Sequence, residues 1–160
     1  MKTNVSQMLL RAPRVAGIVP VFLASTFLMP SQSRASERWA TLEAIHQLEN
    51  PQNSAEPGTC GELGAYQFRE ETWKMHTSAP FSRALDRRSS DAVAVKHYEW
   101  IKGELERRGI IATPYRIALV WNGGIRAVLV EHPPSAAVDY ASRAANLAEY
   151  FEKSEVATAR

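Results

Sequence analysis

The sequence predicts a mainly helical, single compact domain with one long loop, and three observations support this prediction. Apolar residues recur at spacings of three and four along most of the chain, as in helices with one buried face. Residues 50–64 lack that spacing and hold two prolines and three glycines, so we expect a loop there, with at most a short hairpin. The chain downstream of residue 35 has the natural size of one domain with one core.

The first 35 residues have the composition of a secretory signal peptide. They contain no Asp or Glu, four basic residues and the uncharged run VAGIVPVFLASTFLMP. Small residues at Ser33 and Ala35 follow the run, as they do before a cleavage site. We therefore predict a signal peptide at 1–35, cleavage after about Ala35, and a mature domain at 36–160 that is periplasmic or secreted.

An uncleaved anchor is the alternative interpretation of this segment. The run is somewhat short for a bilayer span and contains Pro20, which favours cleavage. Without the leader, 15 Lys plus Arg (19 minus four) face 17 Asp plus Glu, a net charge of about −2. With no basic stripe interleaved with aromatic residues, nucleic acid is not an expected partner. Cys60 is the only cysteine, so we expect no intramolecular disulfide and a half-buried thiol in the loop.

The first expected helix ends at Glu49. Ser36 is its candidate N-cap, and apolar residues follow at every third position, which predicts one buried stripe. This stripe consists of Trp39, Leu42, Ile45 and Leu48. After the loop, residues 69–76 predict a short helix with Trp73 facing the core.

A third helix is expected at 92–109, the longest of the chain. The Ser-Ser-Asp string at 89–91 is its candidate N-cap, and Gly109 lies where a helix terminates. The tryptophans expected to pack in the core are Trp39, Trp73 and Trp100.

Two more helices complete the chain. Thr113 is the candidate N-cap and Pro114 the first residue of a helix at 114–121, which the Asn-Gly-Gly of 122–124 ends. A Pro-Pro-Ser string opens the last helix, at 136–151.

Glu49 is the candidate catalytic acid. It lies on the register of the buried stripe, at the point where the first helix stops. A carboxyl group there is partly desolvated, which raises its pKa. A carboxylic acid that stays neutral near pH 7 can protonate a glycosidic oxygen. A helix-end glutamate that points to water is the alternative, and on this feature alone it is the commoner case.

Two later strings extend the pattern: Gly-Ala-Tyr-Gln-Phe at 64–68 and Ala-Leu-Val-Trp-Asn-Gly-Gly at 118–124. With Glu49, they resemble the soluble, SLT-like lytic transglycosylases of the lysozyme-like superfamily. That family follows its catalytic glutamate, at the same distance, with a Gly-Leu-Met-Gln-hydrophobic string, and later has an Ala-x-x-Tyr-Asn-x-Gly turn. Tyr140 matches the tyrosine of the family's closing helix. The resemblance covers about residues 37–151.

The resemblance implies an α+β lysozyme-like fold with an active-site cleft. It implies cleavage of the β-1,4 bond between N-acetylmuramic acid and N-acetylglucosamine in peptidoglycan, with Glu49 as general acid and then base and with 1,6-anhydromuramyl ends. No cofactor and no metal are implied. The partner is the glycan strand, and the enzyme is expected to be a monomer. Small family members often serve a secretion, conjugation or flagellar assembly of the envelope.

The resemblance also implies roles for the matching residues. Gly64 would let the backbone approach the sugar chain, and Gln67 offers an amide to an N-acetyl group or a hydroxyl. Tyr66 and Trp121 would lie against sugar faces. The expected substrate-binding set is Gly64, Ala65, Tyr66, Gln67, Trp121, Asn122 and Tyr140.

Two alternatives remain open for the function. A lysozyme-type hydrolase would need a second carboxylate, supplied by Glu62 or Glu56, but loop glutamates are usually solvated, which favours the one-carboxylate enzyme. A non-catalytic glycan-binding or scaffold module is the other. Asn50 and Trp121 depart from the Ser and Tyr that are usual in the family.

The histidines predict no metal site, because the four are scattered without a paired ligand spacing. His46 either borders the cleft or lies on the helix surface, and we favour the surface.

Overall fold

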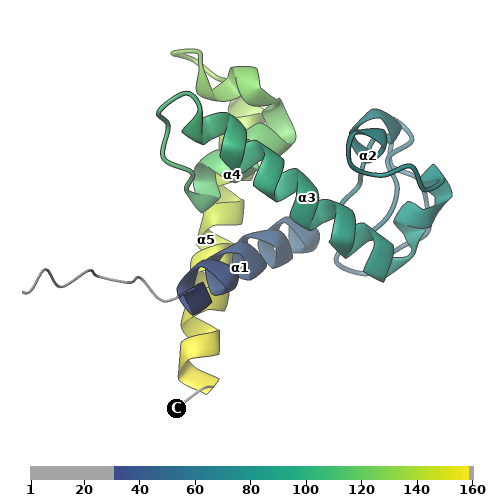
Figure 1. Ribbon diagram of the computed structural model, residues 1–160, viewed down its shortest axis with the longest axis horizontal. Coiled ribbons are helices and arrows are strands. Elements are labelled where there is room, and N and C mark those ends of the chain that lie inside the picture. Colours follow the sequence, from purple (N-terminus) through teal and green to yellow (C-terminus); the bar gives the residue numbers. More distant parts are fainter. Residues whose placement is uncertain (1–30, 159–160) are drawn as a thin grey trace, which may run out of the picture.

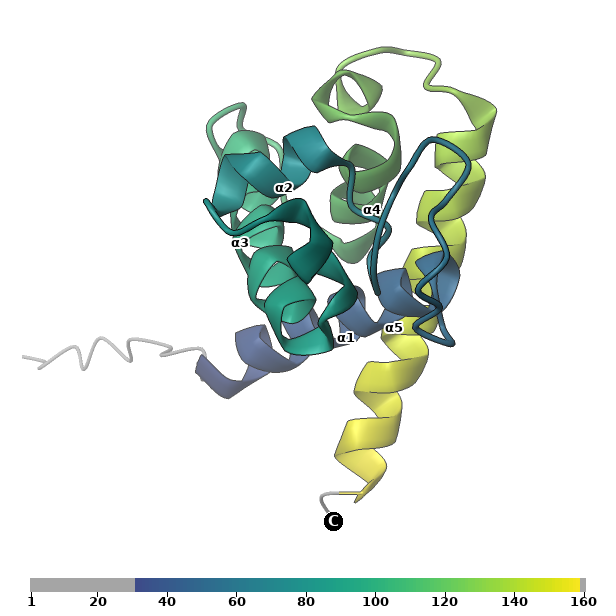
Figure 2. The same ribbon diagram turned by 90° about the vertical axis from the view of Figure 1, so that its right-hand side faces the viewer.

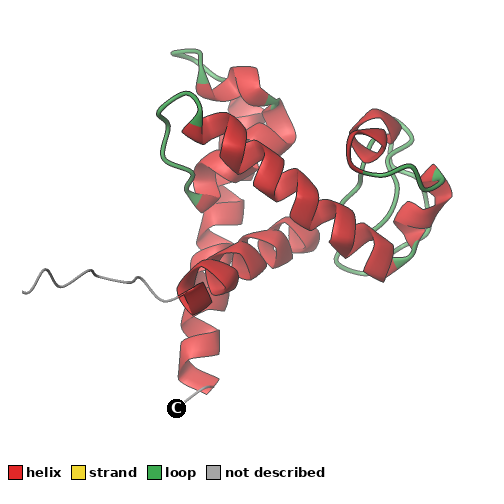
Figure 3. Ribbon diagram, in the orientation of Figure 1, coloured by secondary structure: helices red, strands yellow, loops and turns green. Residues whose placement is uncertain are grey.

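The computed structural model describes residues 31–158, which fold into helices joined by loops (Figures 1 and 3). The mainly helical class is therefore confirmed. Within the described residues, the only β-type pairing is an isolated bridge between Leu63 and Phe68. The elements are α1 (Ser31–Glu49), α2 (Glu70–His76), η1 (Phe81–Leu85), α3 (Arg87–Glu106), α4 (Pro114–Gly123), η2 (Ile125–Val128) and α5 (Ser135–Thr158).

The predicted signal peptide lies mostly outside the described residues. Its last five residues, 31–35, already belong to α1, so the prediction of Ser36 as the N-cap is wrong. The segment from Ser31 to Ser36 contains neither Gly nor Pro, and nothing in it ends a helix. No helix among residues 31–158 is both long and apolar enough to cross a membrane.

Two groups of helices make up the body. Helix α5 packs against both α1 and α4, and α3 packs against η1, α2, α4 and α1. Figure 1 shows α1 crossing α5, with the last turns of α5 extending past it. Figure 2 shows the long loop between α1 and α2 at the side of the molecule where α4 and α5 lie. Residues of this loop line the main hollow of the described structure.

The main core lies between α1, the turn at 63–68, α2, α3 and α4. Its largest fully buried side chains include Trp73, Ile45 and Ile101. A second cluster between α4, η2 and α5 is built from small residues, which allow these elements to approach closely. Its buried members are Ala118, Leu119, Ala127, Ala137, Ala141 and Ala144.

The prediction that three tryptophans pack in the core is wrong for two of them. Trp73 is fully buried, but Trp39 is 46% exposed and Trp100 is 37% exposed. Helix α1 instead buries Ala40 and Ala44 against α5, because small side chains let the two helices cross closely. Trp39 is thereby turned to the edge of the interface.

Capping side chains explain where two helices begin. The side chain of Asp86 accepts a hydrogen bond from the backbone N–H of Ser89 at 2.9 Å, so α3 begins at Arg87 and not after the Ser-Ser-Asp string. Thr113 caps α4 as predicted, accepting from Arg116. Helix α5, with 24 residues, is longer than α3, with 20, so the prediction of the longest helix is also wrong.

Candidate active site

A cavity of about 500 Å³ opens between the end of α1, the long loop and the C-terminal end of α4. Its size falls within the range of small-molecule sites. Carboxyl, amide, hydroxyl and aromatic groups share its wall. The lining residues are Glu49, Gly58, Thr59, Glu62, Tyr66, Gln67, Phe68, Arg69, Thr72, His97, Trp121 and Asn122.

Glu49 is the last residue of α1 and is only partly exposed. Burial raises the pKa of its carboxyl group, and the negative charge of Glu62 raises it further, while a hydrogen bond from Tyr140 opposes both. The raised pKa predicted from the sequence is therefore confirmed. A carboxyl group of this kind stays protonated at a higher pH than an exposed glutamate does.

Tyr140, on α5, reaches Glu49 from the far end of the chain. Its hydroxyl donates a hydrogen bond to Oε1 of Glu49 at 2.7 Å. Burial, with the adjacent carboxylate, raises the pKa of Tyr140 far above its usual range, so the phenol remains a donor. Tyr140 is not among the residues that line the cavity, and its observed contact in the site is with the carboxyl group of Glu49.

Gly64 has a structural role and does not line the cavity; its contact with a sugar chain stays a prediction. Its φ angle is +79°, and a Cβ at this position would lie 1.8 Å from the carbonyl oxygen of Ala84. Only glycine fits a positive φ beneath such a close backbone. A glycine is therefore needed at position 64 because the backbone of η1 lies so close to it.

Ala65 and Tyr66 are core residues, each only 3% exposed; Tyr66 also lines the cavity and Ala65 does not. The hydroxyl of Tyr66 donates to Asp91 at 2.8 Å, and its ring packs against Trp121 and Phe68. Burial and Asp91 raise the pKa of Tyr66 above 10. Tyr66 therefore contributes to the cavity wall from a largely buried position.

Gln67 presents its side chain to the cavity from a strained backbone. Its φ angle is +44°, which is uncommon for a residue other than glycine and is frequent at functional sites. Its Nε2 donates to the carbonyl oxygen of Gly64 at 3.0 Å. A Cβ at Gly58 would lie 2.6 Å from Oε1 of Gln67, so the absence of a side chain at Gly58 gives this amide its place.

Trp121 and Asn122 come from the last turn of α4, and both line the cavity as predicted. Trp121 is half-buried in an aromatic cluster with ring-centroid distances of 5.7 Å to Phe68 and 4.8 Å to His97. Asn122 is exposed, so its amide is free to meet a ligand. Gly124, with a φ of 72°, ends the helix directly after them.

Glu62 corrects the expectation that the loop glutamates are simply solvated. Its carboxylate accepts hydrogen bonds from the backbone N–H of Cys60 at 2.8 Å and from Arg69 at 3.3 Å. These donors, with the N–H of Glu62 itself, lower the pKa of the carboxyl group. The cavity therefore holds one carboxyl whose pKa is raised and one whose pKa is lowered. Glu56 is exposed and does not line the cavity.

Asn50 connects the end of α1 to the long loop at Ser54 and to the turn at Gly64. It is buried, its Nδ2 donates to the carbonyl oxygens of Ser54 and Gly64, and its Oδ1 accepts from the N–H of Ser54. From the sequence, we noted Asn50 only as a departure from the serine that is usual in the family the chain resembles. Its position directly after Glu49 was the signal for this positioning role.

His97 is a wall residue that the sequence analysis missed. It lies on the buried face of α3, stacks on Trp100 with an interplanar angle of 7°, and bonds to His76 at 2.9 Å. Burial lowers its pKa to about 3, so it is neutral. His97 lies on the same face of α3 as the apolar residues Val93, Ala94 and Ile101. This spacing was the signal in the sequence that His97 faces inward.

Two further expectations are corrected. His46 is 3% exposed, so it is a buried residue and not a surface one; it bonds to Glu43, Asn53 and Arg87. Cys60 is exposed and not half-buried. In the part of the chain that the structure describes, no group of three or more His, Cys, Asp or Glu side chains is placed to hold a metal ion.

No family model, no curated protein and no solved structure matches this chain. The cavity brings together a carboxyl group of raised pKa at Glu49, a hydrogen-bonded carboxylate at Glu62, two amides at Gln67 and Asn122, and an aromatic wall.

Proposed function

We propose that the chain is a peptidoglycan-cleaving enzyme with a lysozyme-like fold, whose cleft is the cavity beside Glu49. It breaks the β-1,4 bond between N-acetylmuramic acid and N-acetylglucosamine. The observation that carries the proposal is the carboxyl group of Glu49, which has a raised pKa, a hydrogen bond from Tyr140 and a place on the cavity wall. The sequence resemblance to lytic transglycosylases at Glu49, residues 64–68 and residues 118–124 supports the choice of substrate.

The proposed reaction uses Glu49 twice. Its protonated carboxyl group donates the proton to the glycosidic oxygen, which leaves with the electron pair of the broken C–O bond, while the substrate's N-acetyl carbonyl supports the anomeric carbon. The Glu49 carboxylate then accepts the proton of the sugar's 6-hydroxyl, whose oxygen closes the 1,6-anhydro ring. Tyr140 occupies Oε1 and thereby leaves Oε2 for the transferred proton.

The remaining wall groups fit the binding of an N-acetylated sugar chain. Gln67 and Asn122 provide amide donors and acceptors for acetamido and hydroxyl groups, and Trp121 offers a half-exposed indole edge. The enzyme would work in the periplasm or outside the cell as a monomer, with a secretion, conjugation or flagellar assembly as its larger partner.

A hydrolase of the same bond is the second candidate, and the position of Glu62 favours it. Glu62 is held by two donors, has a lowered pKa and lines the same cavity as Glu49. Two carboxyl groups whose environments move their pKa values apart are the pattern of an acid and a base. In this version Glu62 takes a proton from a water molecule that attacks the anomeric carbon, and the product has an ordinary reducing end.

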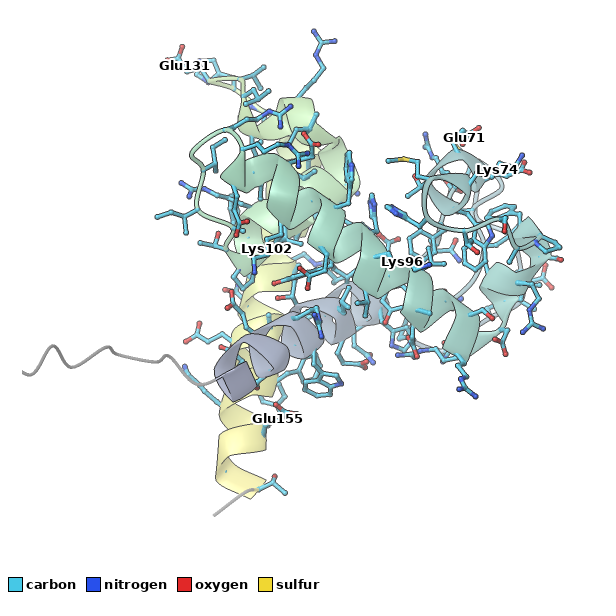
Figure 4. The ribbon with its side chains drawn as sticks, in the orientation of Figure 1. Glu71, Lys74, Lys96, Lys102, Glu131 and Glu155 are labelled. Carbon is cyan, nitrogen blue, oxygen red and sulfur yellow. The ribbon has the colours of Figure 1, made fainter. Side chains whose placement is uncertain are left out.

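Digestion of purified cell-wall sacculi tests the proposed activity. We expect Glu49→Gln to lose more than about a hundredfold in rate, because general acid catalysis contributes on this scale. Glu71→Gln is the matched control, since Glu71 is exposed on α2 and points away from the body (Figure 4). Wild-type digestion rates for Glu49→Gln would refute the role of Glu49, and a folded wild type that binds sacculi without releasing fragments would support the binding module.

The variant Glu62→Gln separates the two catalytic versions. A transglycosylase needs one carboxyl group, so Glu62→Gln would keep activity within about tenfold of wild type. In the hydrolase Glu62 is the base, and its loss would cost about a hundredfold or more.

A further inference from the structure

A second cavity, of about 260 Å³, lies between α1 and α3. It is not part of the catalytic cavity, although Tyr66 lines both. Its volume is below the range of drug-sized pockets and leaves room for one small ring. The lining residues of this α1–α3 groove are Arg38, Trp39, Leu42, Glu43, Tyr66, Arg87, Asp91 and Val95.

The groove is built by two helical faces and closed by ion pairs. The α3 residues follow at every fourth position, so they lie on one face of the helix. Near one end Arg38 pairs with Glu99 across the two helices at 2.6 Å, and near the other Arg87 contacts Glu43 at 3.5 Å. These two pairs link the helices at the two ends of the hollow.

The groove combines an exposed indole with fixed polar groups. Trp39 is 46% exposed, and its ring packs edge-on against Phe151 with centroids 6.1 Å apart. Asp91 accepts bonds from Tyr66 and Arg87 through Oδ1, and no described contact occupies its Oδ2. The groove thus offers an aromatic surface beside a carboxylate oxygen and the guanidinium group of Arg38. The guanidinium group of Arg87 is already bonded to Asp91, His46 and Glu43.

This chemistry matches one pyranose ring. The C–H face of a sugar packs on an aromatic ring, and its hydroxyl groups bond to carboxylate and guanidinium groups. Lipid tails do not suit a groove with an ion pair at each end, and a lone anion does not suit one that contains Glu43 and Asp91.

We propose that the α1–α3 groove is a second carbohydrate site, which binds one N-acetylhexosamine unit with Trp39 as its stacking surface. The identity of the sugar rests on the proposed function. The enzyme holds one part of a glycan network in this groove while it cleaves another part in the catalytic cavity. Tyr66, which is bonded to Asp91 in the groove and packed on Trp121 in the cavity, is the common wall.

Titration of the Glu49→Gln protein with N-acetylglucosamine, followed by ¹H–¹⁵N NMR, tests the proposal. We expect shifts at the Trp39 indole and at the amides of Asp91 and Val95, separate from those at the Trp121 indole. Trp39→Ala would weaken the groove response at least tenfold and leave the Trp121 response unchanged. Tyr150→Ala is the control, because Tyr150 is exposed on α5 outside both cavities.

A second variant guards against a local change in fold. Val95→Trp fills the groove and would abolish its response while it retains Trp39. Saturating sugar without shifts at Asp91 and Val95, or a response unaltered by Trp39→Ala and Val95→Trp, would overturn the second site. Shifts in the groove without any at Trp121 would instead support the groove and count against the proposed function of the catalytic cavity.

Discussion

Glu49 and Glu62 are the same residue type in one cavity, and their surroundings give them opposite properties. Glu49 is half-buried with one hydrogen-bond donor, Tyr140, whereas Glu62 accepts from Cys60 and Arg69. Burial raises the pKa of the first, and hydrogen bonds lower that of the second. One carboxyl group is therefore suited to donate a proton while the other stays charged.

The hydrogen bond from Tyr140 predicts a pH effect. It lowers the pKa of Glu49 against the larger effect of burial, so Tyr140→Phe should raise that pKa further. The alkaline limb of the pH–rate profile, where the acid loses its proton, would move to higher pH. A hydrogen bond to a charged group contributes about 1.5–3 kcal/mol, so we expect kcat at the optimum to fall about tenfold or more. An unmoved alkaline limb would mean that Tyr140 does not act through Glu49.

Gly64 allows a second prediction with a matched control in the same loop. Gly64 and Gly61 have φ angles of +79° and +83°, but a Cβ would clash with Ala84 only at Gly64. Gly61→Ala should cost about 1–2 kcal/mol of unfolding free energy through its backbone alone. Gly64→Ala should cost about 1–3 kcal/mol more because of the clash. Urea unfolding measures both; equal losses would contradict the packing role of Gly64.

The sequence predicts some properties of single residues and not others. The raised pKa of Glu49 follows from its register on α1 and from the end of that helix, which are local features. The burial of Tyr66 does not follow, because it depends on Asp91, 25 residues later in the chain. An aromatic residue in a turn has the same local pattern whether it meets a ligand or the core.

At the scale of elements, Asn50 fixes the long loop to the end of α1. Asn50→Ala would leave the N–H of Ser54 without its described partner and the carbonyl of Gly64 without one of its donors. The variant loses the three hydrogen bonds of the Asn50 side chain. Each such bond contributes about 0.5–1.5 kcal/mol, so we expect a loss of about 2 kcal/mol in urea unfolding. Gln52→Ala, at an exposed loop position, is the control. A loss no greater than that of the control would remove Asn50 from this role.

Helix starts show why element boundaries were only partly predictable. Thr113 followed by Pro114 is a strong local signal, and α4 begins there. For α3 the sequence analysis predicted the Ser-Ser-Asp string at 89–91 as the cap and did not consider Asp86. The structure uses Asp86, which lets α3 follow η1 directly. Asp86 is also the residue that directly follows η1.

At the scale of the whole molecule, the cavity beside Glu49 is assembled from segments between residues 49 and 122, and α5 contacts it through the hydrogen bond from Tyr140 to Glu49. The sequence resemblance predicted that Glu49, residues 64–68 and residues 118–124 contribute to one site, and residues from all three line the cavity. It did not predict the α1–α3 groove, because that groove depends on which faces of two helices pack. The exposure of Trp39 has the same cause.

Burial of Glu49 predicts that the stability of the whole fold depends on pH. Its pKa is higher in the folded than in the unfolded chain, so its contribution to stability falls as pH rises above the unfolded value, near 4.5. Glu49→Gln does not titrate. We expect this variant to gain stability over wild type from about pH 4.5 upward, with no gain at lower pH. Thermal unfolding across pH measures the difference; a constant difference would contradict the burial of this charge.

Mass spectrometry of the soluble products from purified peptidoglycan tests the central claim most directly, with wild type and Glu49→Gln side by side. We predict fragments one water lighter than the hydrolytic products, released by wild type and not by Glu49→Gln. Fragments with ordinary reducing ends would contradict ring closure and support Glu62 as the base. Release of the same fragments by Glu49→Gln at the wild-type rate would contradict the assignment of the acid itself.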